Sequence, residues 1–354
     1  MRDIPKDLNG RTGRGEARNR QVDAVPPVAV IDLGSNTLKV TVATIAGGSD
    51  PSDIVVSGGG KFKIRVISRV TEEVRISPLA GEPEGAVSPR AMRDGAAAAR
   101  RLLDAALAAG ATRERVRIVA TSMVRDAANG AEFCAAVAAA TGGLRVEVLD
   151  GLAEARGVAA AVATDPAFAR EPLFRVVDLG GGSLEHILVE RGAVRFEGSR
   201  PLGAARLTRR FVPAPAEPIP PALLATVEDA ALSGLAGFAE PADAAVRASP
   251  VAGCGGVFSV ARAIFAAREG VAFRDRSPVL PVAEVRRLRD EMAAVPLDDR
   301  ICPALSAQRA DIFPVALTVL LAFARVSGAA AFRETGRNLR IGLIAQMLAQ
   351  SPAR

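Results

Sequence analysis

The sequence contains one nine-residue pattern twice, 146 residues apart. Residues 30–38 (VIDLGSNTL) align without a gap with residues 176–184 (VVDLGGGSL), and the Asp-Leu-Gly core is identical. Thr37 in the first copy is matched by another hydroxyl residue, Ser183, in the second. In both copies a short apolar run, typical of a buried strand, delivers a carboxylate and then a turn of small residues. The repeat therefore predicts a duplicated domain whose two loops face each other across a cleft.

The elements around the two copies alternate in the manner of an α/β protein. Strands are predicted at residues 28–33 and from Leu38 onward, and a helix begins with Ser88 as N-cap and ends at Gly110. Further strands are predicted at residues 116–120, 144–149 and 174–179, with β-rich segments to residue 196. Helices are expected near residues 131–140, 153–163, 223–236, 257–267, 282–292, 312–324 and 339–349.

A chain of 354 residues is long for one compact core, which agrees with two lobes. We expect a flexible polar tail at residues 1–26, a first domain at 27–155 and a second domain at 156–354, whose last helix is free to pack back on the first. The tail lacks the apolar stretch of a secretory signal. The longest strongly apolar run, residues 315–324, is too short to span a bilayer and predicts a buried helix. We therefore expect a cytoplasmic protein without a membrane partner.

Composition narrows the classes of partner. With 45 Lys and Arg against 39 Asp and Glu, the net charge is +6, which favours a polyanionic partner, although an arginine-biased composition explains it equally well. Trp and Tyr are absent, so aromatic platforms for single-stranded nucleic acid are scarce and no specific nucleic-acid partner is expected. His186 is the single histidine, which excludes a multi-histidine metal site. The three cysteines are far apart and indicate a reducing compartment. A homodimer is left open.

The two repeated loops have the chemistry of a phosphate site. A carboxylate at a strand end is costly unless it is solvated, hydrogen-bonded or holding a cation. Glycines after it allow successive backbone N–H groups to converge on an anion. Asp, a hydroxyl and a glycine turn together favour Mg²⁺ and phosphate oxygens. Two copies in register therefore predict phosphate binding by Gly34, Ser35, Asn36, Thr37, Gly180, Gly181, Gly182 and Ser183.

Two other phosphate-binding motifs are excluded. Gly58-Gly59-Gly60-Lys61 is followed by Phe62 and lacks the leading glycine of a P-loop. The loop at residues 180–182 does not have the spacing of a dinucleotide-binding fingerprint, and residues 185–188 after it indicate a strand where that motif needs a helix.

Six segments, two of which contain the repeated loops, make the chain resemble a known family. They resemble, in family order, the motifs of the Ppx/GppA phosphatases (exopolyphosphatase and guanosine pentaphosphate phosphohydrolase), in their short two-domain form. The segments are residues 30–37, 120–129 (ATSMVRDAAN), 151–156 (GLAEAR), 177–185 (VDLGGGSLE), 202–208 (LGAARLT) and 309–311 (RAD). The resemblance implies two duplicated RNase H-like lobes of the actin-like ATPase and sugar kinase superfold around a central cleft.

The resemblance also implies hydrolysis of a terminal phosphoanhydride and assigns roles to matching residues. Glu154 would be the general base that activates water, and Arg125 would neutralise charge on the transferred phosphoryl group. Metal would be held or oriented by Asp32, Asp178 and Glu185. The expected cofactor is Mg²⁺, with Mn²⁺ as the alternative.

Three positions depart from the family pattern. Ala153 precedes Glu154 where the family has a pair of glutamates, Val257 replaces a threonine, and Ile341 replaces a glutamate. None of these changes removes a core catalytic group. They leave the substrate and the catalytic rate open.

Structural explanations remain for the same residues. Glu154 would favour a helix N-terminus in any case, Arg125 and Asn129 could fix a loop, and Glu185 and His186 could be solvated strand residues. An arginine cluster at residues 206, 209 and 210 could line a channel, whereas a second cluster at 286, 287 and 289 is typical of a solvated helix face.

The short form favours an exopolyphosphatase acting on inorganic polyphosphate. The first alternative is the same chemistry on pppGpp. The second is a catalytically weak phosphate- or nucleotide-sensing protein, which the retention of Glu154 and Arg125 disfavours. The third is a kinase on the same superfold, for which no acceptor motif is present.

Overall fold

The computed structural model describes residues 25–47, 50, 53–56, 62–78, 85–236 and 243–350. Only residues 25 and 26 of the predicted polar tail (1–26) belong to the described residues. The segment from Gly58 to Lys61 lies outside the described residues.

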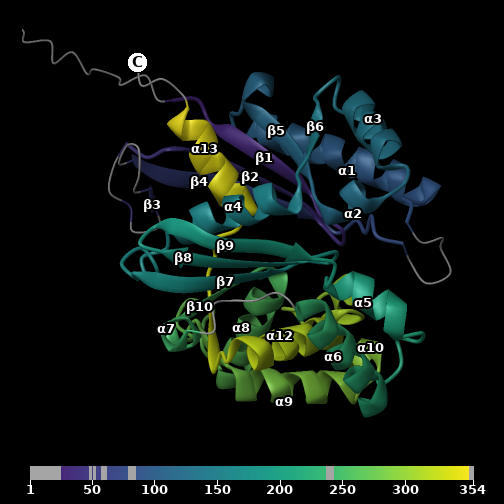
Figure 1. Cartoon of the computed structure of the whole chain (residues 1–354). Coiled ribbons are helices and arrows are strands. Elements are labelled where there is room, and N and C mark those ends of the chain that lie inside the picture. Colours follow the sequence, from purple (N-terminus) through teal and green to yellow (C-terminus); the bar gives the residue numbers. More distant parts are fainter. Residues whose placement is uncertain are drawn as a thin grey trace, which may run out of the picture.

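Two six-stranded sheets form the centre of the molecule (Figure 1). The first has the order β3-β4-β2-β1-β5-β6, built from β1 (Val28–Leu33), β2 (Leu38–Ile45), β3 (Ile54–Val56), β4 (Phe62–Glu72), β5 (Val116–Ala120) and β6 (Val146–Val148). The second has the order β11-β12-β10-β7-β8-β9, built from β7 (Leu173–Leu179), β8 (Leu184–Glu190), β9 (Ala193–Arg200), β10 (Val251–Cys254), β11 (Val279–Pro281) and β12 (Ala331–Glu334).

The two sheets repeat one arrangement. In each, the strand before the repeated loop pairs antiparallel with the strand after it, β1 with β2 and β7 with β8. The first strand of each hairpin also pairs in parallel with a strand on its other side, β5 or β10. Both hairpins have the same register, because Leu33 faces Leu38 and Leu179 faces Leu184. The predicted α/β fold of two duplicated lobes is therefore confirmed.

Helices form three layers around the sheets (Figure 1). The outer face of the first sheet is covered by α1 (Pro89–Ala108) and α3 (Gly130–Ala140). Between the sheets lie α4 (Gly151–Val162) and α13 (Leu339–Ala349). The outer face of the second sheet is covered mainly by α5 (Ala204–Phe211), α6 (Pro221–Leu235), α8 (Gly256–Glu269), α9 (Val282–Ala293) and α12 (Phe313–Ser327). The short helices are α2 (Ser122–Asp126), α7 (Ala244–Ala248), α10 (Leu297–Arg300) and α11 (Ala307–Ala310).

Local signals explain where the main helices begin and end. Ser88 caps α1 by accepting a hydrogen bond from the Ala91 N–H at 3.2 Å, and Pro89 occupies the first turn. Gly110 follows the helix with a φ of 92°, a backbone conformation that favours glycine. Helix α12 is buried over almost its whole length, as its apolar run predicts. Within the described residues, no helix combines the length and apolar character needed to cross a membrane.

The two helices between the sheets cross at glycines. A Cβ atom on Gly342 of α13 would overlap the backbone of Gly157 in α4, so both helices depend on glycine for their close approach. Helix α13 also contacts β1 and β2 of the first lobe. Helix α4 contains residues 155 and 156, where the sequence suggested the domain boundary, and it contacts the strands of the second sheet. These two helices bring their first turns to the space between the lobes.

Candidate functional site

The two repeated loops meet between the lobes. The first loop (residues 34–37) joins β1 to β2, and the second loop (residues 180–183) joins β7 to β8. A Cβ on Gly181 would lie 3.0 Å from the Ser35 Cβ, and one on Gly182 would lie 2.9 Å from the Ser35 Oγ. Glycines in the second loop therefore allow it to contact the first loop directly. Both loops line a cleft with a volume of about 530 Å³.

Among the described residues, the carboxylates that line the same cleft are the four predicted from the sequence and Glu334, which pairs with Arg262 at 2.8 Å. Asp32 and Asp178 lie at the ends of β1 and β7, and Glu185 faces Asp178 across the second hairpin. Glu154 comes from the first turn of α4, whose N-cap Asp150 accepts a hydrogen bond from the Ala153 N–H at 2.7 Å. The fold thus brings together acidic residues that the sequence placed on two repeats and one helix.

Burial and mutual repulsion raise the pKa of three of these carboxyls. The pKa of Glu154 lies well above its ordinary value because of burial and then of Glu185, Asp178 and Asp32, against an opposing effect of Arg125. Burial and the neighbouring Asp178 raise the pKa of Glu185 to about 7. Burial and Asp32 raise the pKa of Asp178 to about 6. Negative charge is therefore crowded in this part of the cleft, and a cation would stabilise it.

Glu154 and Arg125 lie next to each other. The Arg125 Nη1 is 3.6 Å from the Glu154 Oε2 and donates a hydrogen bond to the Leu149 carbonyl at 2.9 Å. The Glu154 side chain is buried, and its Oε2 accepts no hydrogen bond from the described residues. Arg125 therefore both holds the segment before α4 and faces the carboxylate. A buried carboxylate oxygen without a donor is available to a water or a ligand.

Asp32 has a cationic partner within the protein. The Arg340 Nη1 donates to the Asp32 Oδ2 at 2.8 Å, and the Arg340 Nε donates to the Thr41 Oγ1 at 3.1 Å. Among the described residues, no three His, Cys, Asp or Glu side chains form a group that could hold a metal ion. The metal roles expected for Asp32, Asp178 and Glu185 stay predictions about this cleft. Its donor set fits a divalent cation bound by one or two carboxylates and shared with substrate phosphates.

The structure adds cationic residues that the sequence did not single out. In the part of the chain that the structure describes, the cleft is lined by Lys39, Arg69, Arg309, Arg337 and Arg340. Burial, Arg340 and Arg309 lower the pKa of Lys39 to about 8, against Asp32 and Asp178, which raise it. When the internal alignment is extended by one residue, Lys39 occupies the position that Glu185 occupies in the second copy, 146 residues later. The alignment therefore pointed to position 39 as a candidate cleft residue. Arg309 lies in the segment 309–311, which resembles a family motif but for which the sequence predicts no role.

Other predicted residues have structural partners. Asn129 binds the backbone of Val87 through both ends of its amide, at 2.8 and 2.9 Å, so it fixes the loop before α1. Glu185 accepts a hydrogen bond from Ser199 at 2.7 Å. The idea that Glu185 and His186 are solvated is wrong, because each is 1% exposed. Strand β8 has a paired strand on each side, β7 and β9, and His186 packs against the Phe323 ring on its other face.

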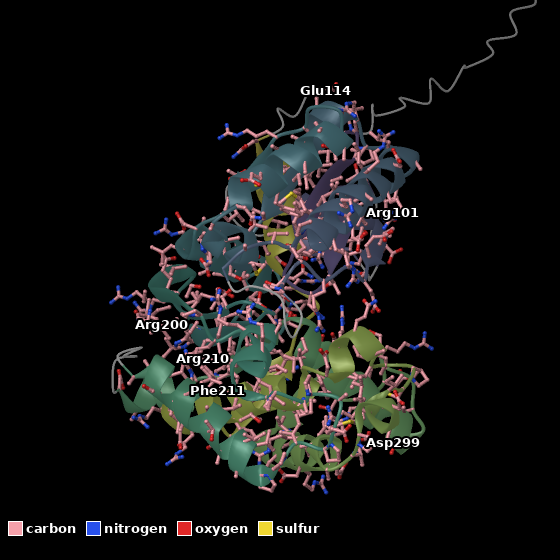
Figure 2. The ribbon with its side chains drawn as sticks, turned by 90° about the vertical axis from the view of Figure 1, so that its right-hand side faces the viewer. Arg101, Glu114, Arg200, Arg210, Phe211 and Asp299 are labelled. Carbon is pink, nitrogen blue, oxygen red and sulfur yellow. The ribbon has the colours of Figure 1, made fainter. Side chains whose placement is uncertain are left out.

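Neither arginine cluster lines the cleft. Arg206 donates to the Gly182 carbonyl at 2.9 Å and pairs with Asp126 at 2.5 Å, so it supports the second loop. Arg210 is exposed and lies over the Phe211 ring, and Figure 2 shows it on the same side of the molecule as Arg200. In the second cluster, Arg289 pairs with acidic neighbours on the outer helices.

Comparisons with known proteins agree with this arrangement. The model of the Ppx/GppA phosphatase family matches residues 54–351. Exopolyphosphatase 2 of Mycobacterium tuberculosis is 33% identical over 192 residues, which cover 53% of this chain and 55% of that protein. The guanosine-5'-triphosphate,3'-diphosphate pyrophosphatase of Photobacterium profundum is 25% identical over 92% of this chain and 60% of its own length. The matches thus span between about half and three fifths of these curated relatives.

Solved structures show the same fold. An exopolyphosphatase from Cytophaga hutchinsonii superposes with a TM-score of 0.74 at 22% identity, over 92% of this chain and 99% of that chain. The Ppx/GppA family member from Aquifex aeolicus gives a TM-score of 0.70 at 22% identity, over 92% and 99% of the two chains. These likenesses confirm the predicted actin-like fold. With the family match over most of its length, the chain belongs to the Ppx/GppA phosphatase family.

Proposed function

We propose that the cleft hydrolyses terminal phosphoanhydride bonds and that its main activity is exopolyphosphatase, the release of phosphate from the ends of inorganic polyphosphate. One observation carries the proposal. The Glu154 Oε2 is buried without a hydrogen-bond donor from the described residues, 3.6 Å from the Arg125 Nη1, in the cleft lined by both phosphate loops. A base, a cation and N–H donors are the groups that phosphoryl transfer to water needs.

In this proposal Glu154 accepts a proton from the attacking water. The water oxygen forms a bond to the terminal phosphorus, and the bridging oxygen leaves with the shortened chain. The raised pKa of Glu154 makes it a stronger base than an exposed glutamate. Arg125 and the N–H groups of the two loops stabilise the charge on the transferred phosphoryl oxygens, and fixed donors in an enclosed site are effective at this.

A divalent cation completes the proposed site. Asp178 and Glu185 would hold or orient Mg²⁺, or Mn²⁺ in its place, and Asp32 would contribute if its contact with Arg340 opened. The raised pKa values of Asp178 and Glu185 support this, because burial raises both and a neighbouring carboxylate, Asp32 for Asp178 and Asp178 for Glu185, adds negative charge that a cation would offset. When bound, the ion would neutralise substrate phosphate charge.

Polyphosphate is the substrate that we put first. The cleft is lined by the cationic side chains of Lys39, Arg69, Arg309, Arg337 and Arg340, which suit a ligand with many negative charges. The relatives named as exopolyphosphatases show 31% to 33% identity to this chain, against 25% to 27% for those named after guanosine phosphates. The second candidate is pppGpp, which the longer alignment with the latter relatives favours.

Three free cysteines favour a cytoplasmic setting.

The test is phosphate release measured side by side on long polyphosphate, tripolyphosphate and pppGpp with Mg²⁺. We expect release from all three, with the highest kcat/KM on long polyphosphate. A higher kcat/KM on pppGpp would make the guanosine nucleotide the main substrate. Tight binding of polyphosphate without release from any of the three would contradict the hydrolase and favour a sensing protein.

A further inference from the structure

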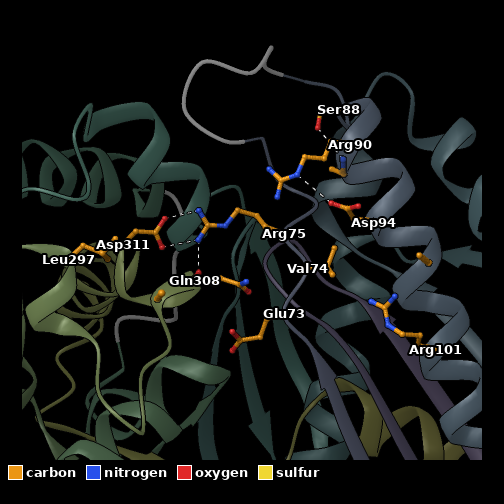
Figure 3. A pocket seen from close by; sticks show the side chains of 13 residues that line it. Glu73, Val74, Arg75, Ser88, Arg90, Asp94, Arg101, Leu297, Gln308 and Asp311 are labelled. Atoms are coloured by element: carbon orange, nitrogen blue, oxygen red, sulfur yellow. Dashed lines mark hydrogen bonds and ion pairs between the residues drawn. The ribbon is translucent and has the colours of Figure 1, made fainter.

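Arg75 connects the first phosphate loop to the second lobe. It lies just after β4, and its Nε donates to the Asn36 Oδ1 at 2.5 Å. Its Nη1 and Nη2 donate to the two carboxylate oxygens of Asp311 at 2.6 and 2.8 Å, and Nη2 also donates to the Gln308 carbonyl at 2.5 Å. Figure 3 shows this guanidinium reaching across from the first lobe to Asp311 and Gln308. One planar side chain thus binds three residues from two lobes.

Asn36 takes part with both ends of its amide. The Oδ1 accepts from Arg75, and the Nδ2 donates to the Gln308 carbonyl at 2.9 Å. This assignment of the amide is the one in which each atom meets a partner of the right kind. The Asn36 side chain is therefore engaged between the lobes, and the contribution of this residue to a bound phosphate is left to its backbone N–H.

The backbone next to Arg75 holds the same loop. The N–H groups of Ile76 and Ser77 both donate to the Ser35 carbonyl, at 3.0 and 2.9 Å. On the opposite side, Gln308 and Arg309 are consecutive residues of α11, and Arg309 lines the cleft. The Arg75 contacts thus join the loop that would bind phosphate to the helix that presents a cleft cation.

Much of this connection between the first phosphate loop and the second lobe depends on the Arg75 side chain itself. A cavity of about 420 Å³ lies beside it, between α1 and the segment after β4 on one side and α10 and α11 on the other. The Arg75 and Asp311 side chains are only 17% and 16% exposed. A bidentate pair shielded from water is stronger and more directional than an exposed one. The neighbouring Arg101 pair with Glu72 is more open, with Arg101 54% exposed, and stays within the first lobe.

We propose that Arg75 is a positioning residue that couples the Asn36 side chain of the first phosphate loop to the second lobe, so that closure of the lobes and completion of the phosphate site are one event. The role in turnover rests on the proposed function, but the placement of the loop does not. A lysine cannot replace Arg75 in this role, because one ammonium group lacks the planar fork that reaches Asn36, Asp311 and Gln308 together.

The experiment compares Arg75→Ala, Arg75→Lys and Asp311→Asn with wild type, and uses Arg101→Ala as the matched control. Backbone hydrogen exchange of the first loop and of α11 should become about tenfold faster in both Arg75 variants and in Asp311→Asn, and should not change in Arg101→Ala. On long polyphosphate with Mg²⁺, kcat/KM should fall about 10²-fold in Arg75→Ala. The kcat/KM of the double variant Arg75→Ala/Asn36→Ala should lie no more than about twofold below that of the single variants, because both substitutions break the same connection.

Unchanged loop exchange in folded Arg75→Ala and Asp311→Asn would overturn the proposal, and so would full recovery of slow exchange by lysine. Additive losses of kcat/KM in the double variant would also overturn it, since Arg75 would then act independently of Asn36. If wild type releases no phosphate, the exchange experiment still decides whether Arg75 places the loop. A failure of the hydrolase proposal is therefore distinguishable from a failure of this one.

Discussion

Asp178 is the carboxylate with the strongest case as a metal ligand, since it ends β7 inside the cleft and its pKa is raised to about 6 by burial and Asp32. Asp178→Asn should raise the Mg²⁺ concentration for half-maximal phosphate release by roughly tenfold or more, because an amide is a poorer ligand for a hard cation. Asp32→Asn should have a smaller effect, because Asp32 is paired with Arg340 at 2.8 Å. A Mg²⁺ titration that is unaltered in both variants would reduce the two carboxylates to structural strand ends.

Glu185 makes the stability of the metal-free protein depend on pH. Its pKa is raised from 4.5 to about 7 in the folded state, so the folded protein retains a proton that the unfolded chain has released. The resulting stability is complete below about pH 4.5 and is lost as the pH rises through 7. The glutamine of Glu185→Gln cannot ionise. The free energy of unfolding of this variant should therefore rise by up to about 3 kcal/mol relative to that of wild type between pH 4 and pH 8. Urea unfolding in EDTA measures this, and exposed Asp299→Asn serves as the control. An equal pH dependence in wild type and Glu185→Gln would contradict the raised pKa.

The residues of the cleft were predictable to the extent that they lie on the repeat. Asp32 and Asp178 follow from the internal alignment, since both end a buried strand before a loop. Arg340 could not be found in this way, because its partner Asp32 is 308 positions away and meets it only when α13 crosses back over the first sheet. The Asn36 side chain was equally hidden, since its partners Arg75 and Gln308 belong to different lobes.

At the scale of elements, α5 offers a test of how a long phosphate chain is held. Arg210 is exposed at the far end of α5, whose first residue, Ala204, lines the cleft. Long polyphosphate should therefore have a lower KM than tripolyphosphate, and this advantage should fall as salt screens the arginines. Arg209→Ala/Arg210→Ala should reduce the advantage, whereas Arg286→Ala/Arg287→Ala on the exposed face of α9 should not. A chain-length preference that is equal in both double variants would confine substrate recognition to the cleft.

The order of elements could be predicted well, because it depends on local signals. Ser88 and Pro89 start α1, and the apolar run at residues 315–324 lies inside α12. Contacts between distant segments could not be predicted. The proline-rich connection at residues 213–221 is held by Arg300, which is 1% exposed and donates to the carbonyls of Pro215 and Glu217 at 2.7 and 2.6 Å. No local pattern around Arg300 indicates that role.

At the scale of the whole molecule, the core between the sheets is shared by both lobes. Helices α4 and α13 pack against residues of the first sheet, such as Val30, and of the second, such as Val176. Glu154 stands in the first turn of α4 and Arg340 in that of α13, so the packing of this shared layer sets both side chains within the cleft. Motion of one lobe relative to the other would therefore change the positions of these side chains in the cleft directly.

The central claim is that this cleft hydrolyses phosphoanhydrides with Glu154 as its base, and Glu154→Gln tests it most directly. The substitution keeps the shape of the side chain and removes its ability to accept a proton. Single-turnover phosphate release from polyphosphate with Mg²⁺ should slow by about 10²–10⁴-fold, while equilibrium binding of the same polyphosphate stays within about threefold of wild type. Release at a near wild-type rate would contradict the account.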